Sequence, residues 1–453
     1  MLLMALVEFA IVYSSVYVAV VVGYGGLDAF QVAHGSLAPR AAIVASMVLV
    51  SLIAMGLYQF HQRLYVREAA LRVLVGLIGG YLIVAVVFYA LPETKIARDL
   101  ANVSFGYSLA LLLAVRYFFV MTVDRNVFRR RTLIFGAGER AASLMQLRRS
   151  ADRRGFRIVG RVAAPGDVVV GDREGVLVTN GKSIADIAIE ENADEIVIAM
   201  DERRGNLPVR ELLDARLVGV DVIDLVEFLE RESGKIRIDL VNPGWLIFSP
   251  GFRISKLRKV SEWILDTLIC AGLLLLMWPV MLLIALAIKC EDGLSAPVFY
   301  RQCRVGKGNR HFNVLKFRSM SVDAEADGKA VWAQKGDKRI TRVGDILRRS
   351  RLDELPQLLN VVRGEMSVVG PRPERPEFVE DLQQKIPYYS ERHAVKPGIT
   401  GWAQLRYAYG SSDEDAVEKL QYDLYYIKNQ SLMLDIMIIL QTVEVVLWGK
   451  GAR

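Results

Sequence analysis

The sequence predicts a membrane protein of three parts: four N-terminal transmembrane helices, a doubly wound α/β domain, and a mainly α C-terminal domain that carries a re-entrant membrane helix. Three observations support this. Four apolar runs open the chain, a glycine turn between an expected strand and helix follows them, and a proline interrupts a fifth apolar run. A chain of 453 residues also exceeds the roughly 250 to 300 residues of a single core. The parts are expected at residues 1–123, 124–250 and 251–453.

The four N-terminal apolar runs have the length of membrane helices. They cover residues 3–23, 41–60, 74–91 and 103–122, and about 20 apolar residues suffice to cross the hydrocarbon of a bilayer. Arg116 lies inside the fourth run, where it is expected to snorkel to the interface or to face a partner helix. The runs therefore predict four membrane spans.

Positive charge predicts the orientation of these spans. Arg63, Arg67 and Arg72 lie between the second and third runs, and eleven arginines oppose three acidic residues over residues 124–161. Short loops rich in lysine and arginine stay in the cytoplasm. Everything after residue 122 is therefore expected on the cytoplasmic side of the membrane.

Alternating strands and helices are expected after the membrane region. Gly136, Gly138 and Ala141 form a GxGxxA pattern between a strand and a helix, and a further helix is expected over residues 209–217. Strands are expected at residues 132–135, 157–162, 195–200 and 219–224, and the last two look like buried parallel strands. This order of elements predicts a Rossmann-like α/β domain.

Dinucleotide chemistry is not expected from this domain. An acidic residue about 20 positions beyond the glycine pattern would normally bind the ribose, but the expected strand at residues 157–162 ends without one, and the sequence holds no Tyr-x-x-x-Lys pair. We therefore expect a packing or regulatory role. The domain is also a hypothetical homodimer contact, which a size measurement after deletion of residues 124–242 would test.

A fifth apolar run, at residues 263–289, contains Pro279 near its middle. Proline removes a backbone donor and clashes with the preceding turn. Basic residues flank both ends of the run: Lys256, Arg258 and Lys259 before it, and Lys289, Arg301 and Arg304 at its end and beyond. No single orientation of a spanning helix favours this charge pattern, so a re-entrant helix over about residues 260–289 is predicted, bent at Pro279. A fifth span is the alternative that hydrophobicity alone supports.

Composition excludes several kinds of site. Cys270, Cys290 and Cys303 form no CxxC spacing and the four histidines are scattered, so neither a disulfide framework nor a zinc site is indicated. A metal here should be a hard cation held by carboxylates and phosphates. The net charge of +7 fits a phosphate-rich ligand, an anionic membrane surface, or simply solvated faces. No nucleic-acid partner is expected.

The sequence RSRLDELPQLLNVVRGEMSVVGPRP, residues 349–373, sets Asp353 and Glu354 at the head of an apolar helix. Pro356 fits the first helical turn and Gly364 the C-terminal stop. Acidic residues are favoured at this end of a helix for structural reasons alone. The surrounding arginines would also keep a carboxylate ionised, and an ionised aspartate beside Mg²⁺ can attack a phosphoanhydride. Asp353 and Glu354 are therefore candidate catalytic residues and candidate Mg²⁺ ligands.

Two further patterns are candidates for contact with phosphate. Residues 314–320 alternate like a strand and place Lys316 and Arg318 on one face, where they suit a diphosphate or simply face water. Residues 370–378 contain three prolines that stiffen the backbone, so this edge either reads a planar base or merely forms a turn. The candidate substrate-binding residues are Lys316, Arg318, Pro371, Arg372 and Pro373.

From about Ser255 to the C-terminus, the chain resembles the monotopic phosphoglycosyl transferases, the bacterial polyprenyl-phosphate sugar-1-phosphate transferases. The shared features are the proline-broken helix, LKFRSM, the segment around the acidic pair, VKPGITGWAQL at residues 395–405, and YDLYYIKNQSLMLDI at residues 422–436. Residues 1–250 resemble the extension of the large members. LRYAYGSS at residues 405–412 replaces a Gly-Arg-Asn run and resembles an exopolysaccharide-type subgroup.

This resemblance implies transfer of a sugar-1-phosphate from a UDP-sugar to undecaprenyl phosphate, with release of UMP, at the cytoplasmic face of a bacterial inner membrane. Asp353 would be the nucleophile that forms an aspartyl-phosphosugar intermediate, Glu354 its partner, and Mg²⁺ would bridge both to the diphosphate. Lys316, Arg318 and Arg372 would contact phosphate or nucleotide. The reaction would start exopolysaccharide or other surface-glycan assembly, with the UDP-sugar, undecaprenyl phosphate and the lipid bilayer as partners.

Two alternatives to this function stay open from the sequence. One is a membrane-tethered nucleotide-sugar oxidoreductase that uses Gly136 and Gly138, which bound NAD(H) or NADP(H) would support. The other is a non-catalytic membrane scaffold or nucleotide sensor. No residue in the sequence identifies the sugar.

Overall fold

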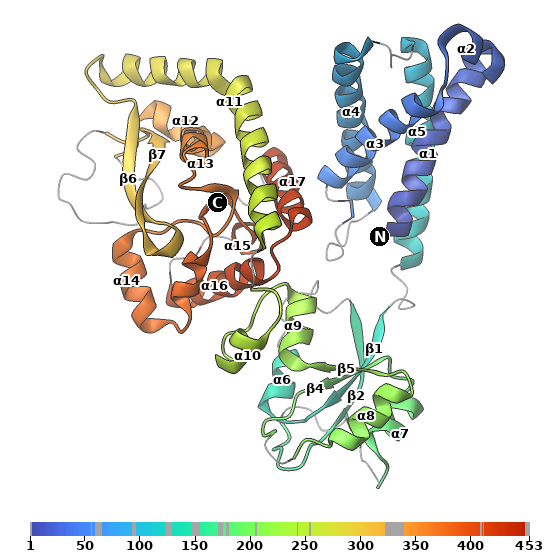
Figure 1. Cartoon of the computed structure of the whole chain (residues 1–453), viewed down its shortest axis with the longest axis vertical. Coiled ribbons are helices and arrows are strands. Elements are labelled where there is room, and N and C mark those ends of the chain that lie inside the picture. The colour runs from blue at the N-terminus through green and yellow to red at the C-terminus, as the bar shows by residue number, and fades with distance from the viewer. Residues whose placement is uncertain are drawn as a thin grey trace. The chain divides into compact units, whose positions relative to one another are not determined.

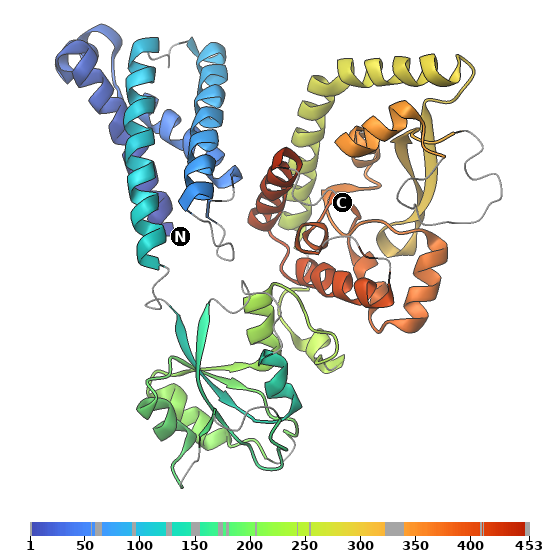
Figure 2. The same cartoon turned by 180° about the vertical axis from the view of Figure 1, so that it is seen from behind.

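The computed structural model describes residues 2–448 apart from 56, 59–65, 93–96, 124–128, 146–154, 171–174, 178–180, 204–205, 242, 253–254, 322–338, 408–409 and 411. The chain divides into two compact units, Met1–Gly234 and Lys235–Arg453. Figure 1 and Figure 2 show their elements from opposite sides.

Five helices form the N-terminal part of the first unit: α1 (Leu2–Tyr24), α2 (Leu27–His34), α3 (Ala38–Ala54), α4 (Val66–Ala90) and α5 (Arg98–Val123). Helices α1, α4 and α5 are long and apolar enough to cross a membrane, and α3 is a shorter apolar helix. The expected second run, residues 41–60, therefore ends as a helix at Ala54, and residues 59 and 60 lie outside the described ones. The short α2 was not predicted, because eight residues are too few to show a clear period.

A buried ion pair joins α1 to α5. Arg116 Nε lies 2.5 Å from Glu8 Oε1, and the two side chains are 4% and 0% exposed. Arg116 Nη1 also donates to the backbone oxygen of Leu57 at 2.8 Å. Arg116 therefore faces a partner helix, which is one of its two expected placements, and it does not snorkel. The two opposite charges compensate each other, whereas either charge alone would be unfavourable in the hydrocarbon of a bilayer.

Five parallel strands form the sheet in the rest of the first unit. They are β1 (Arg130–Phe135), β2 (Phe156–Val162), β3 (Val176–Leu177), β4 (Glu195–Ile198) and β5 (Asp221–Asp224), in the spatial order β3-β2-β1-β4-β5. The helices are α6 (Glu139–Met145), α7 (Ile184–Glu190), α8 (Val209–Leu217) and α9 (Leu225–Ser233). Helices α7 and α8 lie together on one side of the sheet and α6 on the other (Figure 1). The four expected strands and the helix at residues 209–217 are present, whereas the two-residue β3 is too short to predict.

The glycine turn after β1 is filled by a carboxylate of the same domain. Asp201 accepts hydrogen bonds from the backbone nitrogens of Glu139 at 3.0 Å and Arg140 at 2.8 Å, at the start of α6. A Cβ atom at Gly138 would lie 1.8 Å from Asp201 Oδ2, so only glycine permits this contact. Gly136 supplies the positive φ of 136° that the turn requires. In a dinucleotide-binding turn such amides face a pyrophosphate, whereas in this structure they donate to Asp201.

The second unit is mainly helical with two small sheets. Its long helices are α11 (Lys256–Asp292), α16 (Asp413–Lys428) and α17 (Leu432–Trp448), and its shorter ones are α10 (Pro243–Phe248), α12 (Arg342–Ser350), α13 (Gln357–Val362), α14 (Pro376–Lys385) and α15 (Trp402–Arg406). Antiparallel β6 (Phe299–Val305) and β7 (His311–Phe317) form a hairpin, and β8 (Ser367–Val369) pairs in parallel with β9 (Gly398–Thr400). The 3-10 turns are η3 (Lys307–Asn309), η4 (Leu352–Glu354) and η5 (Tyr389–Ala394). Met366, Tyr422 and Ile438 are buried at the core.

Residues 235–250 belong to the second unit, whereas the sequence analysis placed them in the α/β domain. The backbone nitrogen of Ile236 donates to the carbonyl oxygen of Gln421 in α16 at 3.0 Å. Lys428 of α16 lies over the ring of Trp245, with Nζ 4.3 Å from the ring centroid. Contacts with a distant part of the sequence therefore decide this boundary, and local patterns do not reveal them.

Helix α11 is bent (Figures 1 and 2). Both of its ends form ion pairs with other parts of the second unit. Near its start, Arg258 Nη2 lies 2.5 Å from Asp435 Oδ2 of α17. At its end, Asp292 accepts a hydrogen bond from Arg318 Nη2 at 2.7 Å. Pro279 lies inside the helix, and proline is a main cause of sharp helix kinks. We attribute the bend to this residue.

Many large apolar side chains of α11 are exposed. Leu275, Leu276 and Trp278 are 78%, 66% and 58% exposed. Water would penalise so extensive an apolar surface, and α11 is long and apolar enough to enter a bilayer. This surface indicates contact with lipid.

Candidate active site

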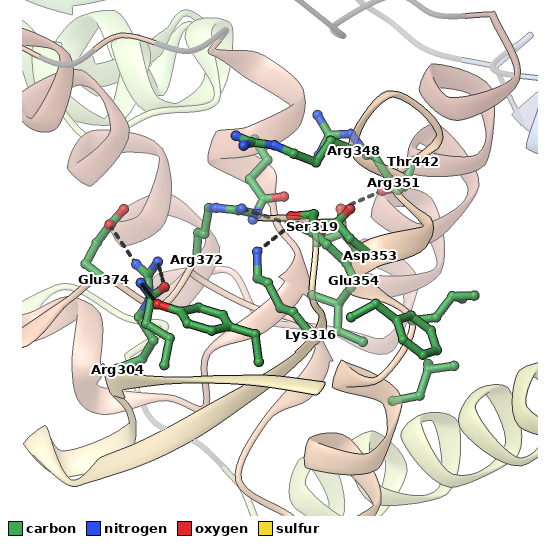
Figure 3. Close-up of a pocket in the computed structure, with 18 of the residues that line it drawn as sticks. Arg304, Lys316, Ser319, Arg348, Arg351, Asp353, Glu354, Arg372, Glu374 and Thr442 are labelled. Carbon is green, nitrogen blue, oxygen red and sulfur yellow. Dashed lines mark hydrogen bonds and ion pairs between the residues drawn. The ribbon is translucent and has the colours of Figure 1, made fainter. Parts of the chain in front are cut away.

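Asp353 and Glu354 lie in η4, a single 3-10 turn between α12 and α13 (Figure 3). The sequence predicts them at the head of a helix, but α13 begins only at Gln357, after Pro356. Arg351 ends α12 in the left-handed conformation, with φ 56°, and so turns the chain into η4. The expected position was therefore wrong in detail, because sequence alone does not separate a short 3-10 turn from the first turn of a helix.

A cavity of about 790 Å³ opens beside η4. Asp353 and Glu354 line it, together with Lys316, Arg318 and Arg372. Lys316 and Arg372 point toward the acidic pair (Figure 3). These residues come from the end of β7 and the residue that follows it, from η4 and from the loop after β8, so the fold brings separate segments to one site.

Pro371 and Pro373 are placed differently. They line a neighbouring pocket of about 10 Å³ together with His393, and neither is among the described residues that line the large cavity. The carbonyl oxygen of Pro373 accepts a hydrogen bond from Arg304 Nη1 at 3.1 Å. The two prolines therefore stiffen the loop that presents Arg372, while their contact with a planar base stays a prediction.

Glu354 is held by two cations. Its Oε1 accepts hydrogen bonds from Lys316 Nζ at 3.2 Å and from Arg372 Nη2 at 3.1 Å. Burial acts to raise the pKa of Glu354, but the charges of Arg372 and Lys316 outweigh it and lower the pKa to about 2. Glu354 is therefore ionised at neutral pH.

Asp353 has the opposite electrostatic balance. Burial raises the pKa of its carboxyl, the Lys316 charge lowers it, and the neighbouring Glu354 charge raises it again, with a net upward shift. Neighbouring carboxyls whose pKa values are pushed apart can take different roles. The carboxylate of higher pKa is the more basic of the two, which favours Asp353 as the candidate nucleophile.

Arg318 lines the cavity and also makes a structural contact. Its side chain is 5% exposed, and its Nη2 lies 2.7 Å from Asp292 Oδ2. Its Nε and Nη1 are buried without a hydrogen-bond partner in the described part of the chain. The guanidinium thus ties the end of β7 to the end of α11 and keeps two donors for an anionic ligand.

Comparison with known proteins reveals the family. The profile described as "Bacterial sugar transferase" matches residues 257–449. The UDP-glucose:undecaprenyl-phosphate glucose-1-phosphate transferase of Xanthomonas campestris pv. campestris is 31% identical over an alignment of 448 residues, which covers 94% of this chain and 91% of that protein. The chain belongs to the bacterial sugar transferase family. The resemblance found in the sequence is thereby confirmed.

Two further relatives of this transferase are similar over shorter lengths. The UDP-N-acetylgalactosamine-undecaprenyl-phosphate N-acetylgalactosaminephosphotransferase of Aeromonas hydrophila is 42% identical over 247 residues, 54% of this chain and 56% of that protein. The exopolysaccharide production protein PSS of Rhizobium leguminosarum bv. phaseoli is 43% identical over 184 residues, 39% of this chain and 91% of that protein. The chain therefore spans about half the length of the Aeromonas relative.

The acidic pair of this transferase suits a Mg²⁺ ion whose remaining ligands come from a bound substrate. The described residues contain no group of three or more His, Cys, Asp or Glu side chains that could hold a metal. Mg²⁺ usually binds through one or two carboxylates plus substrate phosphates. Asp353 and Glu354 could supply two carboxylates, and a sugar nucleotide could supply further oxygens.

Several residues that line the cavity were missed by sequence reasoning. Arg392 and Asp423 line it and lie 2.9 Å apart, Nη2 to Oδ2. They come from η5 and α16, so no local pattern joins them. Asp423 falls within residues 422–436, a segment that carries the family resemblance, and this signal marks the region but not the residue. An apolar wall was also missed: Ile269, Leu273, Ile399, Ile439 and Val443.

Proposed function

We propose that this transferase moves a sugar-1-phosphate from a UDP-sugar to undecaprenyl phosphate and releases UMP, which starts assembly of an exopolysaccharide or another surface glycan. The first two relatives are named for UDP-glucose and for UDP-N-acetylgalactosamine, so the proposed donor is the class of UDP-sugars and no single member of it. The supporting observation is one cavity lined by the adjacent acids Asp353 and Glu354, by a set of cations and by an apolar wall. Cations suit a diphosphate and an apolar wall suits a polyprenyl chain.

Asp353 is the proposed nucleophile. One of its oxygens attacks the sugar-linked phosphorus of the UDP-sugar, a bond between Asp353 and phosphorus forms, and the bond from phosphorus to the oxygen of UMP breaks. A phosphate oxygen of undecaprenyl phosphate then attacks the same phosphorus, and the bond to Asp353 breaks. Splitting one displacement into two is the usual advantage of covalent catalysis.

The other proposed site residues manage the charge of the substrate. Glu354 keeps Lys316 and Arg372 directed into the cavity, and together with Asp353 it would hold a Mg²⁺ ion. The bound ion would neutralise charge on the diphosphate. Arg318, through its remaining donors, and Arg372 would contact phosphate oxygens, as arginine suits these oxygens.

Helix α11 is proposed to be re-entrant. A spanning helix would hold its two ends on opposite sides of the bilayer, but Arg258 and Asp292 at the two ends of α11 bond to the same compact unit. The catalytic unit would then lie on the cytoplasmic face of the bacterial inner membrane. UDP-sugars are made in the cytosol and the phosphate of the lipid lies at the membrane surface, so this placement lets both reach one cavity.

Labelling of Cys303 tests this topology. Cys303 in β6 and Cys290 in α11 are exposed, whereas Cys270 is buried. In a Cys290→Ser variant, a membrane-impermeant maleimide is expected to label Cys303 in inverted membrane vesicles and to leave it unlabelled in intact spheroplasts. A Cys303→Ser variant of the same protein measures background labelling. Labelling from the periplasmic side would mean that α11 crosses the bilayer.

The α/β domain is proposed to be Rossmann-like and non-catalytic. The backbone amides of its glycine turn donate to Asp201 and are not open to a dinucleotide, which argues against the oxidoreductase alternative.

The α/β domain is also the proposed homodimer contact. Helix α8 presents Val209, Leu213 and Leu217 on one face, and these side chains are 65%, 54% and 77% exposed. Apolar residues spaced four apart on a helix face suit a partner surface.

Release of UMP tests the proposed function. The purified chain is supplied with Mg²⁺ and either UDP-glucose or UDP-N-acetylgalactosamine, with and without undecaprenyl phosphate. UMP beyond one equivalent per enzyme is expected only when the lipid and Mg²⁺ are both present. No UMP from any UDP-sugar, together with bound NAD(H) or NADP(H), would instead favour an oxidoreductase.

A further inference from the structure

A buried ion pair beside the acidic site takes no direct part in the two proposed displacements at phosphorus. Arg392 Nη2 lies 2.9 Å from Asp423 Oδ2, and the two side chains are 7% and 3% exposed. Arg392 Nη1 also donates to the hydroxyl of Tyr389 at 2.7 Å. The contacts with Asp423 and Tyr389 hold the guanidinium of Arg392 in one place. Removing one partner from so deeply buried an ion pair is strongly unfavourable.

The same guanidinium bonds to the backbone that carries Arg372. Arg392 Nη2 donates to the carbonyl oxygen of Arg372 at 3.0 Å. Arg372 Nη2 in turn donates to Glu354 Oε1 at 3.1 Å. A continuous set of contacts therefore runs from Asp423 through Arg392 and Arg372 to Glu354. The residues on both sides of Arg372 are prolines, which restrict the backbone, so fixing this carbonyl also fixes where the Arg372 side chain begins.

We propose that Arg392 and Asp423 are a positioning pair for Arg372 and, through it, for Glu354. Asp423 orients the Arg392 guanidinium, and Arg392 sets the position of the Arg372 backbone, so that the Arg372 side chain meets both the acid and a substrate phosphate. Groups in such sites must be held to within roughly 0.5 Å of their productive positions. The inference rests on the proposed function, because it assigns the pair a part in that reaction.

A second buried pair in the same unit provides a matched control. Arg258 Nη2 lies 2.5 Å from Asp435 Oδ2, with side chains 9% and 3% exposed, and Asp435 Oδ1 accepts a hydrogen bond from the hydroxyl of Tyr426 at 3.0 Å. Its chemistry and burial match those of Arg392 and Asp423. Neither residue of this control pair is among the described residues that line the cavity. Breaking it perturbs the contact between α11 and α17 and leaves the hydrogen bond from Arg392 to the Arg372 carbonyl in place.

The test is a double-mutant cycle in the full-length chain, with lipid-dependent UMP release as the readout and thermal unfolding in detergent as the check of folding. Asp423→Asn is expected to lower kcat/KM roughly 10- to 100-fold. In an Arg372→Ala background the same substitution should lower it no further, within roughly twofold. Asp435→Asn should lower kcat/KM by the same factor in the wild-type background and in the Arg372→Ala background.

An equal loss from Asp423→Asn in both backgrounds would overturn the inference, since the pair would then act on the substrate directly or only on stability. If Asp423→Asn does not fold, Tyr389→Phe takes its place in the cycle, because it removes one hydrogen bond from Arg392 and no charge. The loss of kcat/KM that Tyr389→Phe causes should again disappear in the Arg372→Ala background. A loss that persists in that background would overturn the inference. A wild-type chain that releases no UMP would contradict the proposed function instead, before any variant is compared.

Discussion

Asp353→Asn is expected to reduce lipid-dependent UMP release by more than about a thousandfold. A neutral amide is a poor nucleophile toward phosphorus, and one of the two charges that would share Mg²⁺ is lost. Wild-type protein incubated with a UDP-sugar and no lipid should also gain the mass of one phosphosugar on the peptide that contains Asp353. The variant should gain none, as peptide mass spectrometry would show.

Asp345→Asn is the matched control for this substitution. Asp345 lies on α12, and its Oδ2 is 2.7 Å from Arg349 Nη2 at the surface, where its side chain is 47% exposed. Exposed pairs of this kind contribute little to stability, and Asp345 is not among the described residues that line the cavity. This variant should turn over like the wild type. Normal turnover in Asp353→Asn, or a phosphosugar on another residue, would remove Asp353 as the nucleophile.

Much of the fold could be predicted because local patterns reflect local physics. Helices α1, α4 and α5 follow from the length of their apolar runs, and Gly364 ends α13 with a φ of 78°, as its position in the sequence predicts. The second run was extended too far, because apolar residues such as Leu57 continue beyond the end of α3 at Ala54. Hydropathy marks where a chain is apolar, but it does not mark where backbone hydrogen bonding stops.

The candidate site was predictable only in its local parts. Asp353 and Glu354 are neighbours in the sequence, and Lys316 is two residues from Arg318, so each pair could be seen without a structure. The contacts of Arg318 with Asp292 and of Glu354 with Arg372 could not be predicted. They depend on how α11, the hairpin and the loop after β8 pack together, and that packing is set by the whole unit.

The same limit applies to the glycine turn of the α/β domain. Its pattern of Gly136, Gly138 and Ala141 is shared with nucleotide-binding turns, and the missing ribose-binding acid was the only local sign against that role. Asp201, which occupies the turn, lies far along the chain after β4. The local motif predicts the backbone conformation of the turn, whereas a residue distant in the sequence determines which group bonds to its amides.

Glu354→Gln is expected to lower kcat/KM roughly 100- to 1,000-fold. The glutamine keeps the shape of the side chain but removes the charge that Lys316 and Arg372 both contact. The loss should fall mainly on kcat, because the oriented cations stabilise charge that develops during transfer. Glu365→Gln is the control: Glu365 accepts a hydrogen bond from Asn360 at 2.7 Å, away from the described lining of the cavity. Activity of Glu354→Gln within about tenfold of wild type would contradict the assigned role.

The charge of Glu354 should also be visible in the free energy of unfolding. Its pKa in the folded protein, about 2, lies below the ordinary value of 4.5, so the ionised carboxylate stabilises the fold at every pH above 4.5. This contribution, about 3 kcal/mol for a shift of this size, is lost as the pH falls from 4.5 toward 2. Wild type and Glu354→Gln, unfolded in detergent with a chelator present, should therefore differ most near neutral pH and converge in acid. A constant difference would mean that Lys316 and Arg372 do not hold this carboxylate ionised, and the electrostatic reason for its role would fail.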